Sequence, residues 1–342
     1  MKALVVRLSS VGDVIHTLPA LAALKSHGWE VAWLVEPASR PLLEGHPMIE
    51  RVVTLPAARS FRPSTARQAL RLLRADPRDV ALDFQGLWKS AFWARLSRAR
   101  RVIGFDGPWR REALSALLLS ERVELSTDQP HVIDKNLALL RALGIDAVGS
   151  REFPLPPAAL RSQAVEAGIA ERGLSSFVVL NPGGGWASKL WPPERYGAVA
   201  RGLRDRGFRS LVTWGPGDER LADRVAAASD GAAEPCFPTT LLELAALFRK
   251  ARLVVAGDTG PLHLACAVAV PVVGIYGPTE PARNGPFSPL DVVVRRTPLC
   301  SPCHRRRCRT HDGVMEAITP DEVLRAIDAR LGAISGPAAR AV

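Results

Sequence analysis

The clearest chemical signal in the chain is the run Asp258-Thr259-Gly260-Pro261, which is followed by His263. It comes directly after the apolar segment 253–256, so it predicts a buried strand, a tight turn and the start of a helix. A helix start offers unpaired N–H groups and a partial positive charge, which suit an anion such as a diphosphate. His263 could add a donor within the same turn. Alternatively, Asp258 and Thr259 act only as helix caps.

A glycine-rich turn, Pro182-Gly183-Gly184-Gly185, follows the predicted strand Phe177–Asn181, and Lys189 comes four residues after it. Glycines let the backbone approach a ligand closely, and Lys189 could meet a phosphate. The turn has neither the G-x-G-x-x-G spacing nor the G-K-[ST] ending, so it is neither a dinucleotide fingerprint nor a P-loop. The first strand lacks the G-x-G-x-x-G fingerprint too, which argues against an oxidoreductase or a nucleotide-sugar epimerase.

Asp13 is the candidate general base. It ends the small polar turn Ser9–Asp13, which follows the predicted first strand, Lys2–Leu8. A carboxylate in this position can face a ligand and accept a proton from it. Capping of the helix that follows is the alternative, and the spacing does not separate the two roles.

Arginines are concentrated between residues 59 and 78. They are Arg59, Arg62, Arg67, Arg71, Arg74 and Arg78. They could form a cradle for an acidic ligand, or they could be a solvated helix face. The whole chain has a formal net charge of +11, which favours anionic partners, although an arginine-rich background composition would give the same charge.

Near the C-terminus, Cys300, Cys303, Cys308 and His311 form a C-x2-C-x4-C-x2-H run. Three thiolates and an imidazole could hold zinc. The run has no second C-x2-C, so we favour reduced thiols beside several arginines and expect no metal.

The length of 342 residues suggests about two domains, and 47% apolar residues is typical of a globular chain. The apolar segment Ala3–Val6 is too short for a signal peptide, and the run Leu264–Tyr276 contains Pro271 and falls short of a membrane span. The five cysteines are odd in number, and we therefore expect reduced thiols in the cytosol.

Strand and helix patterns alternate in both halves of the chain, which predicts parallel sheets with crossover helices. A proline-rich segment, Phe153–Pro157, interrupts the pattern. We place a domain boundary there, giving domains 1–157 and 158–342, with the C-terminal helix free to pack back on the first domain. The aromatic stripe Trp88, Phe92 and Leu96 is expected to be core rather than a membrane-facing patch.

Several segments, in the same order, resemble the lipopolysaccharide heptosyltransferases of glycosyltransferase family 9, and heptosyltransferase I most. They are Arg7–Pro19, Asp83–Ser90, Lys189–Pro192, Asp258–Gly260 with His263, and Tyr276–Pro281. The resemblance implies the α/β GT-B architecture, in which two Rossmann-like domains with parallel sheets face each other across a cleft. The N-terminal domain would bind the acceptor and the C-terminal domain the nucleotide sugar.

The resemblance also implies roles for individual residues. The catalytic residues would be Asp13, as general base, and Lys189. The donor-binding positions would be Gly184, Gly185, Lys189, Glu219, Asp258, Thr259, Gly260 and His263. The acceptor-binding positions would be Ser10, Gly12, Arg59, Arg62, Gln85, Lys89, Arg111 and His131. Gly184 and Gly185 replace a threonine pair of the first heptosyltransferase type, so backbone N–H groups would replace hydroxyls.

The implied reaction is inverting transfer of L-glycero-D-manno-heptose from ADP-L-glycero-D-manno-heptose to Kdo on lipid A, without a metal or other cofactor. Addition of the second heptose is an alternative, because the cysteine run is more like that of the second heptosyltransferase type. A non-catalytic binder of acidic polysaccharide is the alternative outside enzymes. We expect a monomer that binds no nucleic acid and associates peripherally with the cytoplasmic face of the inner membrane.

Overall fold

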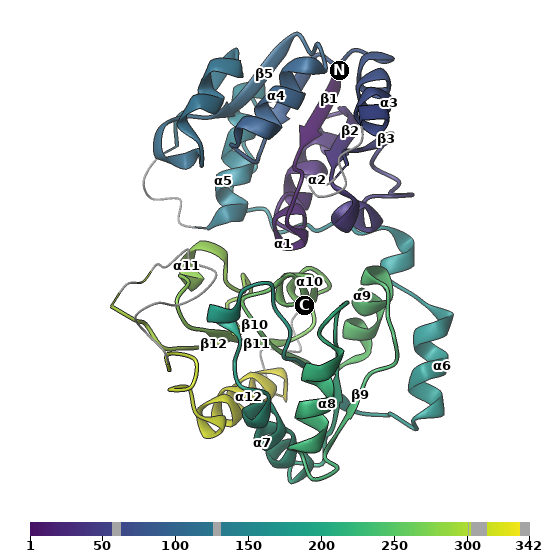
Figure 1. The fold of residues 1–342 in the computed structure, drawn as a ribbon, viewed down its shortest axis with the longest axis vertical. Helices are drawn as coiled ribbons and strands as arrows, with labels where there is room; N and C mark the ends of the chain where they lie inside the picture. Colours follow the sequence, from purple (N-terminus) through teal and green to yellow (C-terminus); the bar gives the residue numbers. More distant parts are fainter. Residues whose placement is uncertain (57–62, 126–130, 300, 302–312, 336–342) are drawn as a thin grey trace. The chain divides into compact units, whose positions relative to one another are not determined.

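The computed structural model describes residues 1–56, 63–125, 131–299, 301 and 313–335. The chain divides into two compact units, Met1–Pro157 and Ala158–Val342 (Figure 1). Each unit is built on its own six-stranded parallel sheet. Two such sheets confirm the predicted α/β class.

The first sheet has the strand order β3-β2-β1-β4-β5-β6. Its strands are β1 (Lys2–Val6), β2 (Glu30–Val35), β3 (Arg51–Thr54), β4 (Val80–Asp83), β5 (Arg101–Phe105) and β6 (Glu121–Val123). β1 pairs with β2 on one side and β4 on the other, and both pairings are parallel. The chain therefore reverses its direction of travel across the sheet between β1 and β4, beside which open parallel sheets bind ligands.

Helices cover both faces of this sheet. They are α1 (Val11–Ile15), α2 (Leu18–Ser26), α3 (Pro63–Arg74), α4 (Trp88–Leu96) and α5 (Val132–Leu139), with the 3₁₀ helices η1 (Pro37–Leu42) and η4 (Ala113–Leu118). Buried residues of α3 and α4 share a core with alternate residues of β1, β2 and β4. α2 packs against α5 and β2. The single helix expected from about Val14 to His27 is two helices, because Pro19 lies in the first turn of the second one.

The second sheet has the order β12-β11-β10-β7-β8-β9, which is the same topology with the strands counted from β7. Its strands are β7 (Phe177–Asn181), β8 (Arg209–Val212), β9 (Ala233–Pro235), β10 (Leu253–Gly257), β11 (Val272–Tyr276) and β12 (Val292–Arg295). The reversal point now lies between β7 and β10, which are paired in parallel. The glycine-rich turn and the Asp258 turn follow these two strands, so the topology brings both predicted donor turns to one place.

The helices of the second unit are α6 (Gln163–Glu171), α7 (Pro193–Arg204), α8 (Glu219–Ala227), α9 (Leu241–Lys250), α10 (Gly260–Ala267), α11 (Pro281–Asn284) and α12 (Pro320–Ser335). α12 packs on α7, β11 and β12 of this unit, and its residues Val323 and Ile327 are fully buried there. The buried side of α12 is therefore part of the core of the second unit.

The expectation that the stripe Trp88, Phe92 and Leu96 is core was wrong for its two aromatic residues. Trp88 is 44% exposed and Phe92 is 42% exposed, whereas Leu96 is partly buried against the core. α4 packs Trp93 and Ala94 on the strands instead. For α3, the sequence pattern predicts Leu70, Leu72 and Leu73 inward; Leu73 is buried and Leu70 packs against the core, but Leu72 is exposed.

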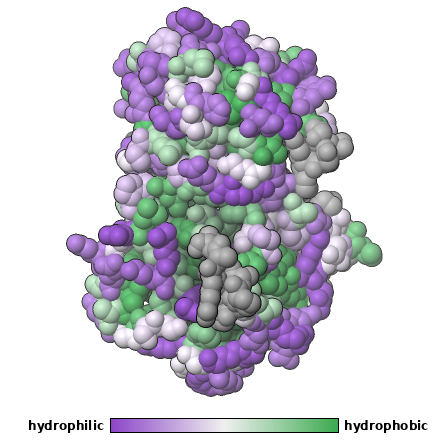
Figure 2. Space-filling model, turned by 180° about the vertical axis from the view of Figure 1, so that it is seen from behind, coloured by the Kyte–Doolittle hydropathy of each residue, from purple (hydrophilic) through white to green (hydrophobic). Residues whose placement is uncertain are grey.

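Hydrophilic residues predominate on the face of the molecule that Figure 2 shows, with hydrophobic residues among them. Among the described residues, the helices are all too short or too polar to cross a membrane.

Candidate active site

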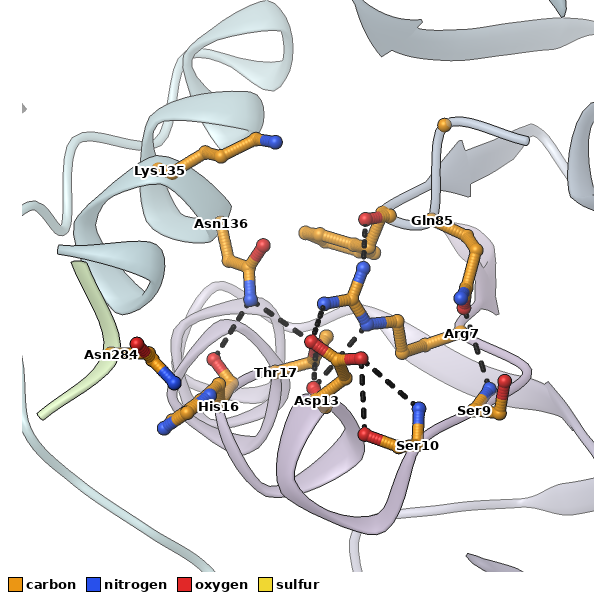
Figure 3. A network of polar contacts seen from close by, with 12 residues as sticks. Arg7, Ser9, Ser10, Asp13, His16, Thr17, Gln85, Lys135, Asn136 and Asn284 are labelled. Atoms are coloured by element: carbon orange, nitrogen blue, oxygen red, sulfur yellow. Dashed lines mark hydrogen bonds and ion pairs between the residues drawn. The ribbon is translucent and has the colours of Figure 1, made fainter. Parts of the chain in front are cut away.

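The turn between β1 and α1 holds Asp13 in a network of polar contacts (Figure 3). One carboxylate oxygen of Asp13 accepts from the backbone N–H of Ser10 at 3.1 Å and from its hydroxyl at 3.2 Å. The other oxygen accepts from Nη2 of Arg7 at 2.9 Å. Asp13 thus closes the capping box of α1, as one sequence interpretation predicted, and it is also held by a buried guanidinium.

Arg7 decides the charge state of Asp13. Burial alone would raise the pKa of the Asp13 carboxyl. The charge of Arg7 and the donors of Ser10 outweigh burial, with a smaller contribution from the charge of Arg111, so the pKa lies below the ordinary value. The Asp13 side chain remains 23% exposed. Asp13 is therefore an ionised carboxylate that a ligand can reach, as a general base must be.

The turn after β4 is tied to the turn after β1. Oε1 of Gln85 accepts from the backbone N–H of Leu8 at 3.0 Å and of Ser9 at 3.4 Å. Arg7 also donates through Nη1 to the carbonyl of Phe84. Gln85 is buried. It would therefore act on an acceptor indirectly, by fixing the conformation of the Ser9 turn, and not by contacting the acceptor with its own amide.

Asp83, which ends β4, shapes this second turn. Its Oδ1 accepts from the backbone N–H groups of Gln85 at 3.0 Å and Gly86 at 3.2 Å. Burial raises the pKa of Asp83 to about 6, and the hydrogen bonds from Ser90 and the turn only partly oppose this rise. Asp83 lies in a segment that carries the family resemblance, but it was not among the predicted site residues.

The other acceptor positions have defined local contacts. Gly12 is buried inside α1, and Ser10 is exposed at its N-terminus. Nζ of Lys89 pairs with Glu36 at 2.6 Å. His131 caps α5, and its ring lies 5.9 Å from that of His16.

Asn136 of α5 fixes the α1–α2 segment. Its Nδ2 donates to the carbonyl of His16 at 2.9 Å and to the hydroxyl of Thr17 at 3.2 Å (Figure 3). Arg111 is exposed, and its backbone N–H donates to the carbonyl of Gly86 at 3.1 Å. Arg59 and Arg62 lie outside the described residues.

In the second unit the two donor turns meet through an ion pair. Nζ of Lys189 lies 2.5 Å from Oδ2 of Asp258 and 4.5 Å from the ring centroid of Trp186. A cation–aromatic contact and a buried carboxylate therefore fix the position of the ammonium group. The lysine side chain is 15% exposed, whereas that of Asp258 is 3% exposed.

Two further side chains reach Asp258. Nδ2 of Asn284 donates to its Oδ1 at 2.7 Å, and Nε2 of His263 lies 3.5 Å from the same oxygen. Burial would raise the pKa of Asp258, but the contacts with His263 and Lys189 hold it far below the usual range. Asp258 is therefore a permanent anion that orients three nitrogen groups.

The start of α10 lies beside the glycine-rich turn. Thr259 is the N-cap residue, but its hydroxyl donates back to the carbonyl of Gly257 at 3.2 Å and does not cap the first turn. A Cβ added to Gly184 would lie 3.0 Å from Cγ2 of Thr259. Glycine thus permits a close approach of the two turns, and the cap position of α10 is left without a side-chain acceptor for its N–H groups.

Glu219 has a local role as the first residue of α8, where its Oε2 accepts from the backbone N–H of Gly217 at 3.0 Å. The carboxylate closest to the glycine-rich turn belongs to Asp218, since a Cβ on Gly183 would collide with it. Burial and the neighbouring Glu219 raise the pKa of Asp218. Gly185 has open space at the position of a Cβ.

The proposed zinc ligands Cys300, Cys303, Cys308 and His311 lie outside the described residues. Within the described part of the chain, His, Cys, Asp and Glu side chains do not gather in groups of three or more that could hold a metal. Cys236 and Cys266 are buried free thiols, and burial raises the pKa of Cys236 to about 12.

The main residues that sequence reasoning missed are Arg7, Asp83 and Asn284. Arg7 and Asp83 each lie beside a predicted site residue at the end of a strand, where a charged side chain is costly unless it is paired. That position was the available signal. Asn284 lies 26 residues beyond Asp258, and the sequence holds no spacing rule that would connect them.

Comparison with known proteins agrees with this geometry. Residues 66–312 match the model of glycosyltransferase family 9 (heptosyltransferase). The chain is 32% identical to lipopolysaccharide heptosyltransferase 1 of Pseudomonas aeruginosa, over 90% of this chain and 87% of the relative. It is 30% identical to lipopolysaccharide heptosyltransferase 1 of Escherichia coli K12, over 86% of this chain and 93% of the relative.

The structure of the E. coli heptosyltransferase WaaC with ADP-2-deoxy-2-fluoro heptose is also similar. It superimposes with a TM-score of 0.74 at 25% identity, over 96% of this chain and 99% of that chain. The two Rossmann-like sheets are thus the GT-B architecture that the sequence predicted. This chain belongs to glycosyltransferase family 9, the heptosyltransferases.

Proposed function

We propose that this enzyme transfers L-glycero-D-manno-heptose from ADP-L-glycero-D-manno-heptose to Kdo of the lipopolysaccharide inner core, carried on lipid A. The names of its relatives support the lipopolysaccharide pathway, and a related enzyme was crystallised with an ADP-heptose analogue. The observation that carries the proposal is the ionised Asp13 carboxylate in the first turn of α1, held by Arg7 and still accessible.

Asp13 acts as the general base in this proposal. Its carboxylate takes the proton of the acceptor hydroxyl as that oxygen attacks the anomeric carbon of heptose. The bond from this carbon to the β-phosphate oxygen breaks on the opposite face, so the configuration inverts and ADP leaves. The low pKa of Asp13 makes it a modest base that is ionised at neutral pH, which suits a step in which bond cleavage leads proton transfer.

The second unit stabilises the negative charge that builds up on the leaving diphosphate. Lys189 supplies a cation, and the first turn of α10 supplies N–H groups and a partial positive charge. Asp258 cannot itself donate to a phosphate, since it stays ionised. Its part is to orient Lys189 and His263. Because these groups supply the charge that a divalent metal would otherwise bring, we expect full activity in the presence of a chelator.

The acceptor would be bound by the first unit, with Arg111 beside the base. A guanidinium pairs with a carboxylate through two parallel hydrogen bonds, and Kdo carries a carboxylate. Arg111 already contributes to the electrostatic environment of Asp13, which places its charge close to the reacting hydroxyl. We propose that the enzyme works as a peripheral protein at the cytoplasmic face of the inner membrane, where such an acceptor would be presented.

The test is ADP release by the purified enzyme with Kdo–lipid A as acceptor, for wild type and Asp13→Asn. The variant should lose about 10²–10⁴-fold in kcat and keep its Kd for ADP, because a positioned base contributes about that much. Asp146→Asn is the matched control, since that exposed aspartate pairs with Arg141 on the surface. Turnover of Asp13→Asn within a few-fold of wild type would reduce Asp13 to a helix cap.

A second acceptor that already carries one heptose distinguishes the two heptosyltransferase types. Faster transfer to the acceptor without heptose supports addition of the first heptose. Transfer only to the heptosylated acceptor would mean that the chain adds the second one, and would overturn the acceptor named here.

A further inference from the structure

The outward face of α4 carries two large aromatic side chains that the fold does not bury. Trp88 and Phe92 are four residues apart, so they lie one turn apart on the same side of the helix. Arg95 follows on the next turn and is also exposed. Because the opposite side of α4 is packed on the sheet, these side chains project away from the core.

The 3₁₀ helix η4 extends this apolar surface. Leu114 is 67% exposed and Leu117 is 77% exposed, and three residues make one turn of a 3₁₀ helix, so both lie on one side. η4 packs directly against α4. The carboxylate of Glu112, just before η4, accepts from the backbone N–H of Trp88 at 2.6 Å, which holds the two helices together at one end. Trp88, Phe92, Leu114 and Leu117 are referred to below as the α4–η4 patch.

The helices around the patch are basic. Neither α3 nor α4 contains an acidic residue, whereas α3 carries Arg67, Arg71 and Arg74. α3 lies in the same layer, because Nε of Arg74 donates to the carbonyl of Leu96 at the end of α4, at 3.1 Å. A shallow depression in α3 is lined by these arginines and Leu70.

Two carboxylates that contact α4 are already paired. Glu112 is bound to the start of α4, and Glu36 pairs with Lys89 of α4 at 2.6 Å. The layer that α3, α4 and η4 form therefore offers apolar side chains together with positive charge.

We propose that the α4–η4 patch is the surface by which this enzyme docks on an anionic lipid bilayer. Tryptophan, phenylalanine and leucine partition into the boundary between headgroups and acyl chains, and neighbouring arginines meet lipid phosphates. Either contribution alone gives weak binding, and the two together give stable but reversible attachment. A protein partner would need no row of positive charge on the adjacent helix, so the charge pattern favours a lipid surface.

The position of the patch in the first unit suits this role. Trp88 begins α4 only five residues after Asp83, the last residue of β4. The patch therefore starts near the carboxyl ends of the parallel strands, as does the segment after β1 that carries Asp13. An acceptor anchored by acyl chains would thus present its sugar next to the base. This consequence rests on the proposed function, whereas the docking itself does not.

The experiment measures binding of the full chain to vesicles that contain no lipid A, by flotation. One set of vesicles contains phosphatidylcholine alone and the other an equal mixture with phosphatidylglycerol. Wild type should float with the anionic vesicles and much less with the neutral ones, and binding should weaken as salt is raised. Trp88→Ser/Phe92→Ser and Leu114→Ser/Leu117→Ser should each reduce partitioning about tenfold or more.

Leu160→Ser/Leu290→Ser is the matched control, since both leucines are exposed in the second unit, and it should float like wild type. Equal flotation of wild type and the patch variants would overturn the proposal, as would equal binding to both kinds of vesicle. A patch variant that floats normally but loses self-association in sedimentation would assign the patch to a second copy of the chain.

Activity on a water-soluble acceptor without acyl chains separates this proposal from the function. The patch variants should keep wild-type kcat/KM on that acceptor and lose efficiency only on the acceptor in vesicles. Loss on both acceptors would mean that the patch residues support the active site, and would overturn a role limited to docking.

Discussion

Replacing Arg7 by methionine should change the pH dependence of the enzyme more than its fold. Arg7 is 5% exposed and donates to Asp13 through Nη2 at 2.9 Å and to the Asp13 carbonyl through Nε at 3.3 Å. An opposite charge this close lowers the pKa of an aspartate by about 1–3 units. Without it, burial would be opposed only by the donors of Ser10 and the charge of Arg111, so the pKa of Asp13 would rise.

The measurement is kcat/KM for ADP release between pH 4 and 9. The acidic limb is the fall of kcat/KM at low pH as the base becomes protonated. In wild type this limb should lie below the ordinary aspartate pKa of 3.8, so kcat/KM should be constant above about pH 5. In Arg7→Met the limb should move to higher pH, so kcat/KM should already fall at a pH where the wild-type value is still constant. Arg7→Lys keeps a charge near Asp13 and should shift the limb less.

The stability of the variant follows from the same pair. A depressed native pKa stabilises the fold above the unfolded pKa of about 3.9, and this contribution is lost as the pH falls through the lower native value. Arg7→Met should therefore be less stable than wild type at pH 7, by roughly 2–4 kcal/mol, with the difference shrinking at acidic pH.

Arg78→Met is the matched control, because Arg78 is equally buried and pairs with Asp76 and Glu50. It should lose stability and keep the wild-type acidic limb. If the limb of Arg7→Met coincides with that of wild type, Arg7 does not set the charge state of the base. In the Asp13→Asn variant, adding Arg7→Met should leave the pH dependence of the remaining kcat/KM unchanged.

Three further predictions concern the other contacts of the site. Lys189→Ala should weaken ADP binding about 10-fold or more in calorimetry, and its remaining activity should not change when a chelator is added. Loss of activity in chelator that only magnesium restores would contradict the charge argument. In wild type the raised pKa of Asp83 makes the folded state bind the proton more tightly, so the free energy of unfolding should fall by up to about 3 kcal/mol as the pH rises from 4 to 6, and Asp83→Asn should not show this fall. Equal urea midpoints at pH 4 and pH 6 in wild type would refute this. Arg111→Lys should raise the acceptor KM nearly as much as Arg111→Ala, with an unchanged Kd for ADP, and wild-type KM in both variants would place the acceptor elsewhere.

The two sheets and the turns that carry the candidate residues could be predicted because the signals were local. Apolar runs followed by polar or glycine-rich turns mark the central strands, and this pattern selected Asp13 in one unit and Lys189 and Asp258 in the other, whereas Gln85 was selected from the family resemblance. The short edge strands β6 and β9 were missed, since each has only three residues and little apolar character. β12 was missed too, although three of its four residues are valines.

The faces of α3 and α4 could not be assigned from the sequence for a different reason. The large apolar side chains of α4 gather on one side of the helix, whereas the buried side consists of Ser90, Ala91 and Ala94 with Trp93, so apolar periodicity points to the wrong face. The packing of Trp93 between α4 and the strands decided this, and it depends on shape complementarity across elements far apart in the chain. The partners Arg7–Asp13 and Asn284–Asp258 depend likewise on tertiary geometry.

The candidate residues of each unit form a buried ion pair, and the two pairs have opposite signs. In the first unit the side chain of Asp13 is 23% exposed and that of its partner Arg7 is 6% exposed. In the second, the side chain of Lys189 is 15% exposed and that of its partner Asp258 is 3% exposed. In each pair the more exposed member is the one whose charge the proposed reaction needs, an anion to take a proton and a cation to meet the diphosphate. The more buried member fixes its position and charge state. Substitution of the buried partner should therefore cost mainly stability and pH range, whereas substitution of the exposed one should cost mainly turnover or donor affinity.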